Sequence, residues 1–134
     1  MAWVETKNTS WTPTVTQNGS VTVTVNNATY SRIGDVIITR VKLTVTGSGS
    51  AGSAIVIGGQ PSAIQAASNA SLMPIGSFII EDSSASIRYV GTIRTQAATD
   101  WRFQTSGVLN ATGVTPSFGL DSGDIISFVA TYQV

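Results

Sequence analysis

Few residues in the chain could carry out chemistry, because its 134 residues include no His and no Cys. Disulfides, thiolate nucleophiles, Ser-His triads and Cys/His zinc clusters are therefore excluded. The remaining candidates for acid–base chemistry are two carboxylate pairs, Glu81 with Asp82 and Asp121 with Asp124. A glycosidase uses two carboxylates about 5–10 Å apart. Asp in such Ser- and Gly-rich segments usually bonds the backbone of a turn, so we expect turn residues here and no enzyme.

The segment Asp121-Ser122-Gly123-Asp124 also offers oxygen atoms to a calcium ion. Calcium takes about six to eight oxygen ligands, usually with several carboxylates, and two carboxylates fall short of that. We therefore expect no metal and no cofactor. A nucleophilic Ser would need Lys7 or Lys42 as its base, and Lys42 lies on the polar face of a predicted strand, where a solvated ammonium is the plain interpretation.

The tryptophans are the candidates for partner binding. Trp11 and Trp101 fit either the stacking of sugar rings or a place in the core or an interface, and Phe103 on the same strand face favours the core for Trp101. Trp3 and Val4 lie in a segment, residues 1–10, without regular alternation. An indole there should dock onto a neighbouring subunit, a partner surface or the core. Trp3, Val4 and Trp11 are therefore our candidate partner-binding residues.

The composition is unusually poor in charge. The chain has 7 basic and 7 acidic residues, which is 10% of the total, against about 25% in an ordinary soluble domain. No basic excess is present to attract nucleic acid or an anionic membrane, so we expect neither as a partner. A mean hydropathy of +0.22 argues against disorder. The composition indicates a β-rich protein with an uncharged outer face, or one that hides part of that face in an oligomer.

Alternation of apolar and polar residues predicts strands along most of the chain. Asn18-Gly19 predicts a hairpin. In the run 36–46 and in the run 125–133, the odd-numbered residues take one face of the predicted strand and the even-numbered residues the other. Asn26-Asn27 predicts a turn and residues 62–73 a loop. The predicted strands are 14–16, 21–25, 28–32, 36–46, 54–57, 77–80, 85–94, 101–105 and 125–133.

Eight or nine short strands with Gly, Asn and Asp between them predict an all-β fold, an antiparallel β-sandwich or jelly roll. We expect an N-terminal arm, residues 1–10, followed by a single sandwich domain, residues 11–134.

Several motifs resemble the β-sandwich modules of tailed-phage virion proteins, which occur in tail-fibre tips and in capsid decoration (cement) proteins. In that family a Tyr-x-Arg-Ile-Gly strand leads into a long Thr-rich strand, a Ser/Gly loop, an Ile-x-Gly-Leu-Pro turn and a closing Gly-Asp-x-Ile-x-Phe-x-x-x-Tyr strand. The similarity covers residues 11–134, with Gln60 where the family usually has Leu. The matching runs are Trp11-Thr12-Pro13-Thr14-Val15, Tyr30-Ser31-Arg32-Ile33-Gly34, Ile57-Gly58-Gly59-Gln60-Pro61 and Gly123-Asp124-Ile125-Ile126-Ser127-Phe128-Val129-Ala130-Thr131-Tyr132.

The resemblance implies a homotrimer on a virion, whereas composition alone also allows a monomer. As a decoration protein, the chain would be made in the host cytoplasm and would bind the major capsid protein on the outer surface of the phage head, with residues 1–10 as a contact. As a tail-fibre tip, it would bind host surface glycans through polar loops such as 47–53. About ten residues precede the predicted sandwich, too few for a fibre shaft, which favours decoration.

Overall fold

The computed structural model describes residues 5–66 and 72–134, and most of the regular structure in these ranges is β-strand. The strands are β1 (Glu5–Ser10), β2 (Thr14–Thr16), β3 (Ser20–Val21), β4 (Val23–Ile33), β5 (Val36–Val45), β6 (Val56–Gly58), β7 (Pro74–Asp82), β8 (Ile87–Ala97), β9 (Asp100–Thr105) and β10 (Ile125–Gln133), and a 3-10 turn, η1, spans Ser62–Ile64. The predicted all-β class is confirmed, with ten strands in place of eight or nine.

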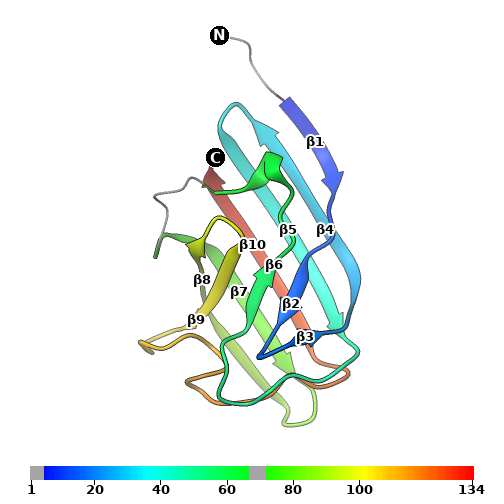
Figure 1. Ribbon diagram of the computed structural model, residues 1–134, viewed down its shortest axis with the longest axis vertical. Coiled ribbons are helices and arrows are strands. Elements are labelled where there is room, and N and C mark those ends of the chain that lie inside the picture. Colours follow the sequence, from blue (N-terminus) through cyan, green and yellow to red (C-terminus); the bar gives the residue numbers. More distant parts are fainter. Residues whose placement is uncertain (1–4, 67–71) are drawn as a thin grey trace.

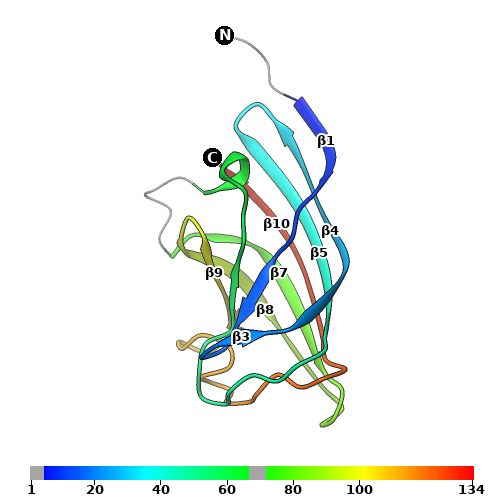
Figure 2. The ribbon, with the colours of Figure 1, turned by 45° about the vertical axis from the view of Figure 1, so that its right-hand side comes forward.

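These strands form one antiparallel sheet in the order β1-β4-β5-β10-β7-β8-β9-β6-β2-β3. The sheet curls into a half-barrel, so that β2, β6 and β9 face β5 and β10 across the core (Figures 1 and 2). Only Thr22 separates β3, at one edge of the sheet, from β4 near the other. The chain therefore passes directly between the two ends of the sheet, around one core. The backbone N–H of Trp11 donates to the carbonyl of Ala28, at 3.1 Å, and so extends the β1–β4 pairing beyond Ser10.

The core follows the predicted alternation in β5 and β10. In each strand the residues predicted to share one face are buried together: Ile37, Thr39, Val41, Leu43, Val45, Ile126, Phe128, Ala130 and Tyr132. Trp101 of β9 is fully buried among them, which confirms its predicted place in the core. Its ring makes edge-on contacts with Trp11, Phe128 and Tyr132, at centroid distances of 6.1, 6.4 and 5.1 Å. Such aromatic pairs stabilise a core beyond the area that they bury.

The first hairpin agrees with its sequence signal, because Val15 pairs with Val21 and Thr16 with Ser20 around Asn18-Gly19. The turn predicted at Asn26-Asn27 is wrong, since β4 continues through both residues. A β-bulge lies between Val25 and Asn27, where the register of β4 against β5 shifts. A bulge inserts one extra residue into one strand of a pair, so the strand continues past it.

The segment expected to be an irregular arm is partly a strand. Residues 5–10 form β1, which pairs with the second half of β4. Asn8, at φ 47°, interrupts the register in the middle of β1. Residues 5–10 contain no apolar side chain, which is why apolar alternation gave no signal there. Residues 1–4 lie outside the described residues. In the predicted loop 62–73, residues 62–64 form η1 and residues 67–71 also lie outside the described residues.

Candidate interaction surface

Two of the three residues predicted to bind a partner, Trp3 and Val4, lie outside the described residues. The third, Trp11, is only 6% exposed. Its indole N–H donates to the hydroxyl of Thr39 at 3.1 Å, and its ring packs on Trp101. Trp11 is therefore a core residue, and the prediction that it binds a partner is wrong. Sequence alternation could not decide this, because Trp11 lies between two strands.

The candidate acidic residues Asp82 and Asp124 close turns, as their sequence context predicted. Asp124 accepts hydrogen bonds from the backbone N–H of Ser83 at 3.0 Å and of Asp121 at 2.9 Å. Asp82 accepts from the backbone N–H of Ala85 at 3.2 Å. Burial raises the pKa of Asp124, opposed by its two backbone hydrogen bonds. Asp82 thus closes the β7–β8 turn, and Asp124 ties that turn to the one that precedes β10.

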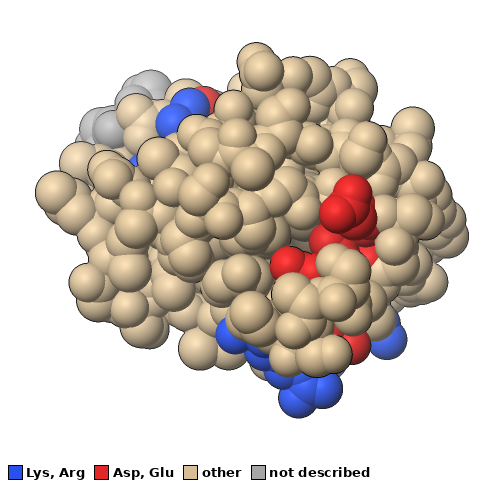
Figure 3. All heavy atoms as spheres, turned by 90° about the horizontal axis from the view of Figure 1, so that it is seen from below, with Lys and Arg blue, Asp and Glu red and all other residues tan. Residues whose placement is uncertain are grey.

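A polar hollow of about 550 Å³ lies at this same end of the molecule, lined by Glu81, Ser83, Ser86 and Arg88. Glu81 and Arg88 form an ion pair at 3.0 Å across β7 and β8. Figure 3 shows acidic side chains gathered beside a hollow on this end, with basic side chains at its margin. Within residues 5–66 and 72–134, no group of three or more acidic residues is placed to hold a metal ion.

The most distinctive surface of the described molecule is the outer face of four adjacent strands. Ile38 of β5, Val129 of β10, Ile79 of β7 and Val90 of β8 are 43, 44, 50 and 51% exposed. These four residues, called here the outer patch, alternate with core residues along their strands, so they point away from the core. Each of four neighbouring strands thus presents one exposed aliphatic group on the same face, which makes this face the candidate interaction surface.

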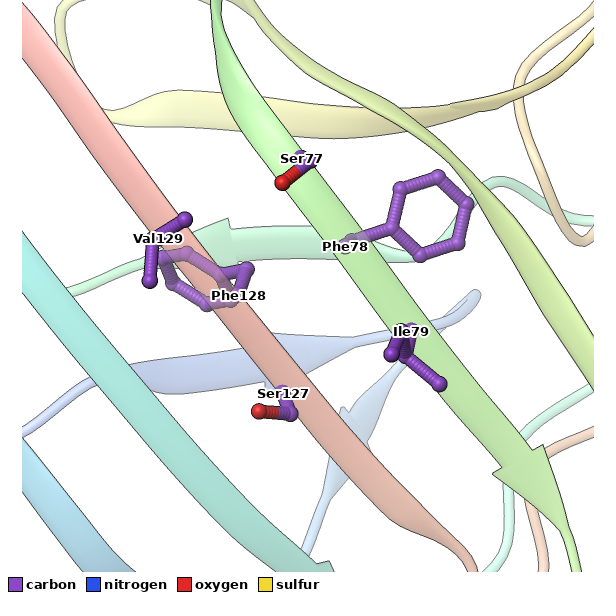
Figure 4. Close-up of a pocket in the computed structure, with 6 residues that line it drawn as sticks. All are labelled: Ser77, Phe78, Ile79, Ser127, Phe128 and Val129. Carbon is purple, nitrogen blue, oxygen red and sulfur yellow. The ribbon is translucent and has the colours of Figure 1, made fainter.

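A shallow depression of about 130 Å³ lies at the centre of the outer patch, between β7 and β10 (Figure 4). Across these two strands Ile79 pairs with Ser127, and Val129 pairs with Ser77. Each pair joins one β-branched side chain to one small hydroxyl, so the serines leave space between the two aliphatic groups. The surface is therefore apolar and hollowed, which is suited to receiving a protruding side chain.

Cationic side chains border the outer patch on β5. Arg40 lies opposite Val129, and Lys42 lies opposite Ser127. Neither residue forms an ion pair within the described parts of the chain. The sequence predicted that Ile38, Arg40 and Lys42 share the polar face of one strand. It gave no signal that β10 and β7 would lie next to that face, because strand order depends on long-range pairing.

Comparisons with known proteins found no matching family model, no matching curated protein and no matching solved structure. The described residues also contain no helix with the length and apolar character needed to cross a membrane.

Proposed function

We propose that this protein is a capsid decoration (cement) protein of a tailed phage, a non-enzymatic β-sandwich module that sits as a homotrimer on the outer surface of the head. The observation that carries the proposal is the outer patch, whose aliphatic groups are 43–51% exposed on four adjacent strands. The motif similarity of residues 11–134 to phage virion modules supports the same conclusion. The low charge content supports it further, since the centres of interfaces are depleted in charged residues.

In this proposal the outer patch is covered by a second copy of the chain. A stable interface buries about 800 Å² on each partner, more than the four residues of the patch alone supply. Its surroundings on β5, β7, β8 and β10 would therefore take part. A trimer presents each weak contact with the major capsid protein three times, so avidity strengthens attachment without any single strong contact. Trp3 and Val4, which directly precede β1, are the proposed contacts with the head.

Sedimentation measures the oligomeric state and so tests whether a second copy of the chain covers the outer patch. We expect wild-type protein to sediment as a trimer, and Val129→Asp to sediment as a monomer, because the new carboxylate would be buried without a partner. Leu109→Asp is the matched control, since Leu109 is 94% exposed in the loop that follows β9 and lies on none of the four patch strands. Far-ultraviolet circular dichroism checks that both variants are folded. A wild-type protein that stays monomeric at all concentrations would contradict the proposal.

Binding to purified heads tests the location. Protein lacking residues 1–4 should remain folded and trimeric but should fail to co-sediment with heads of the phage that encodes it. The sharpest alternative is a tail-fibre tip, which the same motif similarity implies. Immunogold labelling at the tail, together with strong hits on a glycan array, would support that alternative and remove the decoration role.

A further inference from the structure

Two arginines lie directly opposite one another on the outer face of β8 and β9. Arg94 and Arg102 are register partners in this antiparallel pair, a position at which side chains are about 5 Å apart at Cβ. Like charges placed directly opposite destabilise a sheet. In a chain with only 7 basic residues, the pairing of two of them needs a physical explanation.

In the part of the chain that the structure describes, only one of these two guanidinium groups is paired with a carboxylate. Arg102 donates from Nε and Nη2 to the two carboxylate oxygens of Asp100, both at 3.0 Å. Arg94 donates instead to neutral amide oxygens, to Gln104 at 3.1 Å and Gln96 at 2.8 Å. Among the described residues, Arg94 has no carboxylate partner. The pair therefore carries one uncompensated positive charge.

Both guanidinium groups are held in place before any ligand arrives. Two hydrogen bonds fix each group, and the side chains of Arg102 and Asp100 are only 31 and 29% exposed. Burial lowers the pKa of Arg94, and the charge of Arg102 lowers it further. Arg88, on the same face of β8, provides a contrast, because its side chain is 72% exposed and paired with Glu81. Holding two cations in fixed positions reduces the entropic cost of binding an anion.

We propose that Arg94 and Arg102 form a binding site for one anionic oxygen group, a carboxylate or a phosphate. The hydrogen bonds described above use neither Nη2 of Arg94 nor Nη1 of Arg102, so these nitrogens can donate to the anion. Guanidinium groups bind carboxylate and phosphate oxygens through strong charge-assisted hydrogen bonds. The bound anion would neutralise the charge that Asp100 leaves uncompensated. Neither arginine belongs to the outer patch, although Arg94 shares the outward face of β8 with Val90. The anion site is argued from these two arginines alone and does not require the trimer or the head contact.

An NMR titration at constant ionic strength tests the site. It follows the Nε–Hε signals of the arginine side chains as an anion is added. Inorganic phosphate is titrated in one experiment and galacturonate in another, so that the two arms distinguish phosphate from carboxylate binding. We expect saturable shifts of the Arg94 and Arg102 signals in at least one arm, with the Arg88 signal unchanged. Arg94→Gln should weaken that binding about tenfold or more, through the lost charge-assisted bonds. Arg88→Gln is the matched control and should bind as wild type.

Three results would overturn the proposal: no saturable shift with either anion, an equal shift of the Arg88 signal, or unchanged binding by Arg94→Gln. The amide spectrum of each variant shows whether it is folded. If Arg94→Gln fails to fold, Arg94→Lys replaces it. This variant keeps the charge but loses the planar fork, so weaker binding is expected and unchanged binding would also contradict the site.

Discussion

Buried polar side chains act as ties between segments far apart in the sequence. Gln17, which is 1% exposed, donates to the carbonyls of Ser53 at 3.1 Å and Phe118 at 2.8 Å. Its amide oxygen accepts from the backbone N–H of Leu120 at 3.0 Å. A buried amide with its hydrogen bonds formed fixes a unique arrangement, because any other placement leaves polar groups unpaired. One residue beside the first hairpin thus positions two long loops.

Tyr132 provides a prediction at the same scale. Its hydroxyl donates to the carbonyl of Ile64, and burial raises the pKa of Tyr132 above its usual value. The folded state therefore holds this proton more tightly than the unfolded state does. This contribution to stability is fully present below about pH 10 and is lost as the pH rises further.

We expect Tyr132→Phe to lose about 1 kcal/mol of unfolding free energy near neutral pH, through the missing hydrogen bond. The variant should then lose less stability than wild type between about pH 9 and pH 11, because it has no phenol to ionise. Urea unfolding across this range measures both effects. Parallel alkaline losses in the two proteins would show that Tyr132 does not control them.

The contact between β7 and β10 depends on a glycine. A Cβ atom built on Gly76 would lie 1.8 Å from the carbonyl oxygen of Val129, so no side chain fits there without separating the strands. These two strands also carry Phe78 and Phe128 into the core, each 3% exposed. Separating the strands would therefore disturb both faces of the sheet.

Gly76→Ala should destabilise the protein by about 3 kcal/mol or more, the upper end of the range for overpacked sites. Ser77→Ala, at the neighbouring exposed position, is the control and should change stability by less than about 0.5 kcal/mol. Denaturant unfolding gives these values, and the increase in hydrogen exchange over wild type should be largest in β7 and β10 of the glycine variant. Equal stability of Gly76→Ala and wild type would mean that the strands relax apart without cost.

Charge is distributed unevenly over the molecule, although its formal net charge is zero. Most of the cations lie on the outward face of the sheet, and only two acids, Glu81 and Asp100, lie among them. The outward cations on β5, β8 and β9 are Arg40, Lys42, Arg88, Arg94 and Arg102. Asp82, Asp121 and Asp124 lie instead in the turns at one end. The binding of an anion to this face should therefore weaken as the salt concentration rises, because salt screens the charges.

A single core within a sheet joined at both ends should unfold in one step. We expect the tryptophan fluorescence, dominated by the burial of Trp11 and Trp101, and the far-ultraviolet circular dichroism to give coincident denaturation curves. The edge strand β1 pairs with β4 alone, so its amides should exchange faster than those of the central strands without adding a second transition. Two separated transitions would indicate that the two halves of the curled sheet are independent.

The sequence predicted local features well where one face of a strand is buried. The alternation of β5 and β10 and the core position of Trp101 follow from short-range patterns of apolar residues. Predictions were less reliable where backbone irregularities intervene. Asn26-Asn27 has the residue types of a turn, yet β4 accommodates the pair with a bulge, and β1 lacks an apolar face because it is an exposed edge. Trp11 gave no usable signal, because its burial depends on Trp101, which is 90 residues away in the chain.

The sequence by itself determined that the protein is all-β, that it has neither thiol nor imidazole chemistry, and which residues of its long strands share a face. Only the tertiary structure decided the order of the strands, and with it the outer patch and the pairing of Arg94 with Arg102. The physical reason is that alternation is a property of one strand, encoded by neighbouring residues. A surface shared by several strands arises only when backbone hydrogen bonds bring distant segments into register.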